Sequence, residues 1–226
     1  ENDCTLPRCG NNIQDANGAT NKVDALNLAL MAATGIGSTG DAIDVTVTTV
    51  AASGGTGGVY VTDTAGGLTV GTVGALNGAT ATGGNIEIRN TGVDTALTIA
   101  QAVSNSSAGD VTLQSSGSVT LNADVTSSGG NIAVEATGVA ATGFVNQNNR
   151  IETTGAGNID VESQNGAIDM SANTTSETIR GAIEYTAGTS VDLSRLEAPL
   201  GFVGVDANNG AVTDADGAGD NRENVF

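Results

Sequence analysis

The sequence predicts an all-β protein built as a single parallel β-helix of about nine rungs, each of 20–27 residues. A short phrase, glycine followed by apolar, polar and apolar residues, recurs about a dozen times between Val59 and Val212. Such alternation between turn formers is typical of short, half-buried strands. The phrase also has a period, because one apolar residue per cycle gives intervals of 23, 23, 27, 25, 21, 27, 24 and 20 residues. These residues are Ile13, Ile36, Val59, Ile86, Val111, Ile132, Ile159, Ile183 and Val203. A period in the twenties indicates a solenoid whose coils bury their apolar faces against one another.

The composition fits a narrow, stacked interior. Glycine accounts for 33 of 226 residues and proline for 2, so turn formers are plentiful and ladder-breaking residues are scarce. The apolar fraction is 38 % with 2 % aromatic residues, and small branched side chains suit stacked strands. We assign residues 12–212 to one β-helix domain, residues 1–11 to an N-terminal tail and residues 213–226 to a C-terminal junction segment.

One segment, from Val23 to Thr34, has two interpretations. Val23, Leu26 and Leu30 have helical spacing, whereas Leu26, Leu28 and Leu30 alternate as in a strand. Because the segment lies between two rungs of the predicted coil, we favour the strand.

The charge excludes some partners. With 25 acidic and 7 basic residues the chain carries a formal charge of −18, so we expect no binding to nucleic acid or to anionic membrane surfaces. No apolar run reaches the roughly 18 residues of a membrane span, which predicts no membrane insertion. Most outward acids are expected to form a solvated face: Asp160, Glu162, Asp169, Glu184 and Asp192.

The two cysteines, Cys4 and Cys9, are expected to form a small disulfide loop; a bridge to a neighbouring chain and free thiols are the alternatives. A disulfide would indicate an oxidising compartment outside the cytoplasm. Asn105 and Asn173 begin glycosylation sequons, a weak signal in a chain rich in asparagine, serine and threonine.

The candidate metal site is acidic. Asp214, Asp216 and Asp220 resemble the start of a calcium loop, although the third acidic position and the distal glutamate of an EF-hand are missing. We therefore favour an Asx-type turn without a cofactor, with a calcium-bridged junction as the alternative. Phe144, Phe202 and Phe226 are expected to be packing or junction residues rather than carbohydrate platforms.

Catalysis is not expected. Sugar-cleaving β-helix enzymes need clustered carboxylates with a basic residue or histidine, usually beside aromatic platforms. This chain has no histidine or tryptophan, and its seven basic residues are scattered.

Several phrases resemble the repeats of giant bacterial surface proteins of the filamentous-haemagglutinin and autotransporter-adhesin type. They are Asn12-Ile13-Gln14-Asp15-Ala16-Asn17-Gly18-Ala19, Ala32-Ala33-Thr34-Gly35-Ile36-Gly37-Ser38 and Thr56-Gly57-Gly58-Val59-Tyr60-Val61. The resemblance covers most of the chain, and the second phrase is its most specific part. It implies a right-handed β-helix, export to the cell surface or extracellular space, and a structural or adhesive role without catalysis.

The first and last rungs also resemble each other, since residues 12–19 correspond to residues 211–218, 199 positions later. Solenoids need capped ends, and neither terminal segment has the charged, proline-rich or helical character of a cap. We therefore expect a non-enzymatic extracellular filament subunit that forms a head-to-tail homopolymer. The alternative is a repeat segment of a giant adhesin that binds a host or surface ligand, such as a carbohydrate. The expected junction residues are Ile13, Asp15, Leu26, Val212, Asp214, Val225 and Phe226.

Overall fold

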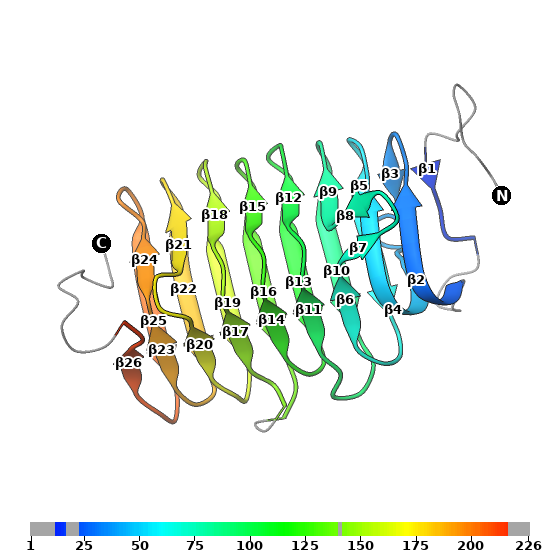
Figure 1. The fold of residues 1–226 in the computed structure, drawn as a ribbon. Coiled ribbons are helices and arrows are strands. Elements are labelled where there is room, and N and C mark those ends of the chain that lie inside the picture. The colour runs from blue at the N-terminus through cyan, green and yellow to red at the C-terminus, as the bar shows by residue number, and fades with distance from the viewer. Residues whose placement is uncertain (1–11, 17–22, 140–141, 217–226) are drawn as a thin grey trace.

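The protein is an all-β solenoid of about eight turns, whose strands stack in parallel along one axis (Figure 1). The computed structural model describes residues 12–16, 23–139 and 142–216, and these residues contain no helix. Each full turn contributes strands to three ladders, and equivalent strands of successive turns pair with each other. The predicted parallel β-helix is therefore confirmed.

The first ladder contains nine strands. They are β1 (Asn12–Ile13), β3 (Gly35–Ile36), β5 (Gly58–Asp63), β10 (Ile86–Asn90), β13 (Val111–Ser115), β16 (Ile132–Ala136), β19 (Ile159–Ser163), β22 (Ala182–Ala187) and β25 (Phe202–Ala207). The nine apolar residues that defined the sequence period lie in these strands, and each pairs in register with the next one, from Ile13 to Val203. The intervals read from the sequence are thus the lengths of the turns.

The second and third ladders are built from shorter strands. The second contains β6 (Leu68–Val70), β11 (Leu97–Ile99), β14 (Val119–Leu121), β17 (Val145–Gln147), β20 (Ile168–Met170), β23 (Val191–Leu193) and β26 (Val212–Asp214). The third contains β9 (Ala79–Ala81), β12 (Val103–Asn105), β15 (Val125–Ser127), β18 (Ile151–Thr153), β21 (Thr175–Thr178) and β24 (Arg195–Glu197). The ninth turn is partial in the described residues, where β25 and β26 are its two strands.

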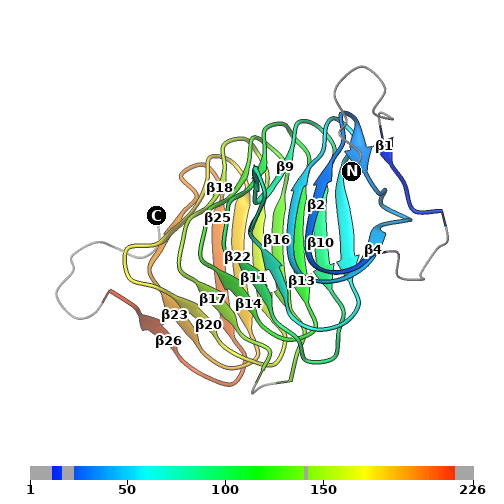
Figure 2. The same ribbon diagram turned by 45° about the vertical axis from the view of Figure 1, so that its right-hand side comes forward.

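The first two turns are built differently, because one long strand replaces two short ones. β4 (Ile43–Ser53) pairs with β5, β6 and β9, so it bends through all three ladders. β2 (Val23–Met31) pairs with β4 and forms the outermost coil at this end, as the rotated view shows (Figure 2). The strand that we favoured for the 23–34 segment is therefore correct, although it ends at Met31.

A short antiparallel hairpin interrupts the third turn. β7 (Thr72–Val73) pairs with β8 (Leu76–Asn77), and Gly74 in its turn has a φ of 61°, which glycine adopts readily. The hairpin packs on β4 and also contacts β2. It therefore fastens the terminal coils to the third turn.

The core is a continuous aliphatic column. In the middle turns the inward side chains are fully buried, as in Ile86, Val111, Ile132 and Ile159, each 0 % exposed. From β10 onward a glycine lies close before each first-ladder strand, and it has a steric cause, because a Cβ on Gly130 would lie 2.2 Å from the carbonyl oxygen of Gly109 one turn earlier. The recurring glycine therefore permits the turns to approach closely at this corner.

Candidate assembly interface at the ends of the solenoid

The two ends of the solenoid leave core side chains incompletely covered. Seven apolar residues pack against the core while remaining partly exposed, and six of them lie on the terminal turns. These six are Ile13, Val23 and Leu28 on the first turn, and Val203, Val205 and Ala207 on the last. The seventh, Ala123, lies in the corner between β14 and β15. Incomplete burial of inward residues is thus mainly a property of the two ends.

Ile13 at one end and Val203 at the other belong to the same column of stacked core side chains. Ile13 pairs with Ile36 at one end, and Val203 pairs with Ile183 at the other, with unbroken pairing between them. A second copy continuing the solenoid would therefore place its Ile13 against Val203 of the first copy. The sequence match between residues 12–19 and 211–218 does not reflect equivalent positions in the coil, because Ile13 lies on the first ladder and Val212 on the second. The interior residues of this column are fully buried aliphatic side chains.

The terminal strands also have open edges in the part of the chain that is described. β1 and β2 pair on one side only, with β3 and β4. At the opposite end β24, β25 and β26 pair only with β21, β22 and β23. An open strand edge offers unpaired backbone donors and acceptors to another strand.

The predicted junction residue Val212 lies at the open end of the second ladder. It pairs with Val191 and is 50 % exposed, whereas its equivalents Val145, Ile168 and Val191 are fully buried. Two positions further on, Asp214 pairs with Leu193. The second ladder thus ends with one apolar side chain available for burial and one carboxylate.

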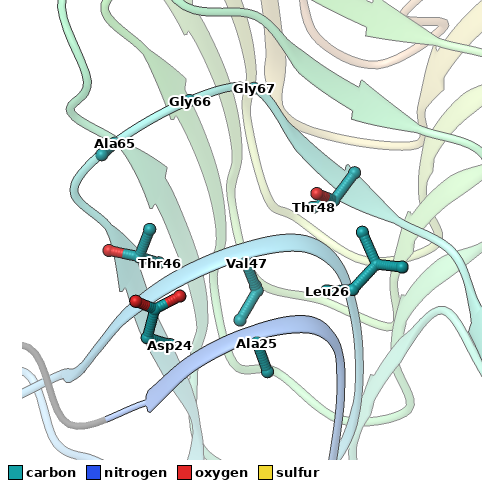
Figure 3. A pocket seen from close by; sticks show the side chains of 9 residues that line it. All are labelled: Asp24, Ala25, Leu26, Thr46, Val47, Thr48, Ala65, Gly66 and Gly67. Carbon is teal, nitrogen blue, oxygen red and sulfur yellow. The ribbon is translucent and has the colours of Figure 1, made fainter.

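Leu26 lies at the bend of β2 rather than in regular pairing. The register between β2 and β4 passes from Ala25 to Asn27 without pairing Leu26, whose side chain is 69 % exposed. With Asp24 and Thr48 it lines a shallow recess of about 310 Å³ against the corner at residues 65–67 (Figure 3). Leu26 is therefore available for contact, but on the outer corner of the first turn.

The remaining predicted junction and disulfide residues divide into two groups. Asp15 is buried, being 8 % exposed, and so belongs to the first turn's interior rather than to an open surface. Val225 and Phe226 lie outside the described residues, as do Cys4 and Cys9. The disulfide and the terminal aromatic contact remain predictions.

The candidate calcium residues are occupied by hydrogen bonds within the protein. Asp214 Oδ1 accepts a hydrogen bond from the backbone N–H of Asp216 at 2.9 Å, which is the geometry of an Asx turn. Asp216 Oδ1 accepts from the N–H of Asn173 at 2.8 Å, and Ser194 donates its hydroxyl hydrogen to the same carboxylate, 3.1 Å from Oδ2. Asp220 lies outside the described residues. No three acidic or cysteine side chains of the described residues are grouped so that they could hold a metal ion together.

The outward acids are concentrated on the C-terminal half, where parallel stacking places like charges opposite each other. Glu135 pairs with Glu162, and Asp160 with Glu184. Burial, followed by the charges of Glu184 and Glu135, raises the pKa of Asp160. Burial, Glu135 and Asp160 raise the pKa of Glu162 in the same way.

A third acidic pair lies on the second ladder. Asp169 on β20 pairs with Asp192 on β23, and burial together with the charge of Asp192 raises the pKa of Asp169. The acids predicted from the sequence include every member of these pairs except Glu135. The predicted turn of 27 residues places Glu135 one turn before Glu162, so it could have been found. The predicted solvated face is therefore also a repulsive one.

A buried polar network crosses the lumen, and sequence reasoning did not identify it. Tyr185, Ser176 and Gln147 are at most 1 % exposed and lie on strands of three different ladders. The Tyr185 hydroxyl lies 2.7 Å from Ser176 Oγ and 2.5 Å from Gln147 Oε1, to which it donates. Gln147 Nε2 donates to Ser176 Oγ at 2.9 Å. Burial raises the pKa of Tyr185 well above its ordinary value, so its phenol remains neutral.

Comparisons with protein-family models, with curated proteins and with solved structures found no match to this chain. The described residues include no helix of the length and hydropathy that would cross a membrane.

Proposed function

We propose that the protein is a non-enzymatic extracellular structural protein whose copies join head to tail into a β-helical filament or surface fibre. The observation that supports this proposal is the pair of half-covered ends, with Ile13 and Val203 terminating the same column of core residues. Stacking would bury these side chains and pair the open edges. Because each joint uses two different surfaces, it leaves a free head and a free tail, and growth continues.

The acidic surface is consistent with such a filament. A charge of −18 on a 226-residue chain disfavours side-by-side aggregation of rods, so association is directed towards the ends. The proposal includes no nucleic-acid partner, no membrane insertion and no cofactor.

Two complementary variants test the joint in the full-length chain. Ile13→Asp introduces a charge at the head, and Val203→Asp introduces one at the tail. Each variant alone should sediment as a monomer of about 22 kDa, because one required surface is lost. An equimolar mixture should form dimers and no longer species, since each variant retains the surface that the other needs.

A control separates lost association from lost folding. Val93 is 88 % exposed in a corner loop, so Val93→Asp should assemble like the original chain. Circular dichroism and thermal unfolding verify that the rod remains folded in all three variants. Monomers in the mixture, or polymers formed by either single variant, would refute the joint.

The alternative role, a repeat segment of a giant adhesin, is favoured by one feature of the surface. Phe202 projects from the outer face and is 60 % exposed, which suits contact with a ligand better than contact within the rod.

A further inference from the structure

Phe202 forms an aromatic surface on the acidic side of the last two turns. It lies on β25, opposite Ala182 of β22, at a position that faces outward because its neighbour Val203 points into the core. The ring is 60 % exposed, and Asp206 is the next outward side chain along the strand, so an apolar ring and a carboxylate lie on the same face of β25.

The ring has a defined position because residue 204 is a glycine. A Cβ built on Gly204 would lie 3.0 Å from Cε1 and 3.2 Å from Cζ of Phe202, so the ring occupies the space above this glycine. Gly204 is the outward residue two positions along the strand, where the preceding turn carries Glu184. The missing side chain thus creates a platform on which the ring lies along the sheet.

Carboxylates border this platform. Glu184 pairs with Gly204, and the same Cβ position would lie 3.9 Å from Glu184 Cγ. Asp206 follows two positions further along β25 and is exposed. Both residues line a shallow recess of about 310 Å³, together with Gly204 and the strand residues Tyr185, Thr186 and Val205, and the ring of Phe202 lies beside this recess through its contact with Gly204. Asp160 lies one turn before Glu184, pairs with it in register and adds a further carboxylate to this face.

The ring of Phe202 and the carboxylates beside it favour a cationic ligand. The face of an aromatic ring attracts cations, and Arg stacks on such a ring more readily than Lys because its guanidinium is planar and weakly hydrated. None of the ion pairs found among the described residues, which involve Arg89, Arg150 and Arg195, includes Glu184 or Asp206. The carboxylates can therefore pair with a guanidinium that rests on the ring.

We propose that Phe202, Gly204, Glu184 and Asp206 form a docking site for an arginine side chain of a basic peptide segment. The site lies on the outer face of the terminal strand β25, whereas the proposed joint uses the inward side chains and the open edge of this strand, so the two use different surfaces. Carbohydrates and metal ions are the competing ligands, because sugar rings also stack on aromatic rings and carboxylates also bind calcium.

The test uses two small probes on the full-length Ile13→Asp variant, which is expected to stay monomeric because its head surface is lost. N-acetyl-arginine amide is titrated at low ionic strength and followed by amide NMR shifts, and the neutral N-acetyl-citrulline amide serves as its nearly isosteric control. The arginine probe should shift the amide signals of Phe202, Gly204 and Asp206, and the citrulline probe should leave them unchanged. Equal shifts with both probes would overturn the proposal.

Variants determine which groups carry the binding. Phe202→Leu keeps an apolar side chain without the ring and should weaken arginine binding about two- to fivefold, the range expected for an exposed cation–π contact. Gly204→Ala should weaken it as well by displacing the ring, and Glu184→Gln should do so by removing charge. Glu177→Gln, on the third ladder, is the matched control and should change nothing. Unchanged binding in Phe202→Leu would refute the site.

Competition distinguishes the other ligands. A linear trisaccharide of glucose that shifts Phe202, in the absence of any arginine effect, would identify a carbohydrate platform and overturn the proposal. Calcium chloride that displaces the arginine probe at equal ionic strength, and shifts the same amides more strongly than the probe does, would identify a metal site and also overturn it. Failure of the head-to-tail test leaves this prediction standing, because the NMR titration reads the monomer.

Discussion

Asp214 pairs in register with Leu193, so a carboxylate ends a column whose preceding members are Leu121, Gln147, Met170 and Leu193. In a stacked pair this carboxylate would approach Leu28 of the next copy, since Leu28 begins the same column through Val50 and Val70. Desolvating a charge against an aliphatic side chain is unfavourable. Asp214 therefore limits the strength of the proposed joint.

Replacing Asp214 with leucine should strengthen association. The leucine extends the apolar column and would be buried on stacking, which lowers the dissociation constant of the joint by roughly tenfold. Analytical ultracentrifugation across a concentration series measures this change. Asp169→Leu is the control, because Asp169 lies on an outward position of β20, which pairs with β17 and β23 and not with the terminal strand β26. Weaker association of Asp214→Leu would contradict the predicted contact.

The lumenal network predicts a specific loss of stability. Tyr185→Phe removes the hydroxyl that donates to Gln147 Oε1, leaving a fully buried acceptor without that partner. We expect a decrease of about 1–3 kcal/mol in the free energy of unfolding, measured by denaturant titration. The double variant Tyr185→Phe with Gln147→Met should recover part of this loss, because Met170 already occupies the adjacent turn of that column. Additive losses would show that the two residues do not cooperate.

The same network predicts sensitivity to alkali. The ordinary pKa of tyrosine is 10.0, and burial raises that of Tyr185 in the folded protein. The folded state then binds a proton that the unfolded chain releases, so stability falls as the pH rises above about 10. Tyr185→Phe should remove this part of the pH dependence.

Much of the fold was encoded locally, whereas the site features depend on contacts between turns. Ile13 to Val203 could be predicted as stacked anchors because each follows a recurring pattern of alternation and turn formers. The bend of β4 was harder to predict, since only two consecutive threonines, Thr48 and Thr49, interrupt its alternation and no glycine marks the corner.

The Tyr185–Gln147–Ser176 network shows why the rest was missed. Its members are 9 to 38 residues apart and meet across the lumen from three ladders, so no spacing along one strand indicates it. Phe202 was expected to be a packing or junction residue, and its outward position became clear only from the pairing of β25 with β22 and from the close approach of the ring to Gly204.

The two glycosylation sequons differ in accessibility. Asn105 is 1 % exposed, and its side-chain amide donates to the Gly84 carbonyl at 2.7 Å. Asn173 lies in an exposed corner with a φ of 66°. In a glycosylating secretory host we expect modification at Asn173 alone, visible as one glycan mass by mass spectrometry. Asn173→Gly, which suits the positive φ, should abolish it, and a glycan on Asn105 would contradict the structure.

The stacked acids predict that mild acid stabilises the rod. The pKa values of Asp160, Glu162 and Asp169 are raised in the folded protein, mainly by burial and then by neighbouring carboxylates. The folded state therefore binds more protons than the unfolded chain, whose ordinary values are 3.8 for Asp and 4.5 for Glu. The stabilising effect is complete below about pH 4 and is lost as the pH rises through the raised values. The denaturant midpoint should consequently be higher at pH 5 than at pH 7.5.

A paired set of variants identifies the cause. Glu135→Gln with Glu162→Gln removes one like-charge pair on the first ladder, so it should raise stability at pH 7.5 and reduce the gain on acidification. Glu87→Gln is the matched control, because Glu87 lies 2.6 Å from Arg89 in an ion pair on the first ladder and pairs in register with Tyr60 and Thr112 rather than with another acid. This control should leave the gain on acidification unchanged. A midpoint that falls between pH 7.5 and pH 5 in the original chain would show that repulsion between the stacked acids does not govern how its stability depends on pH.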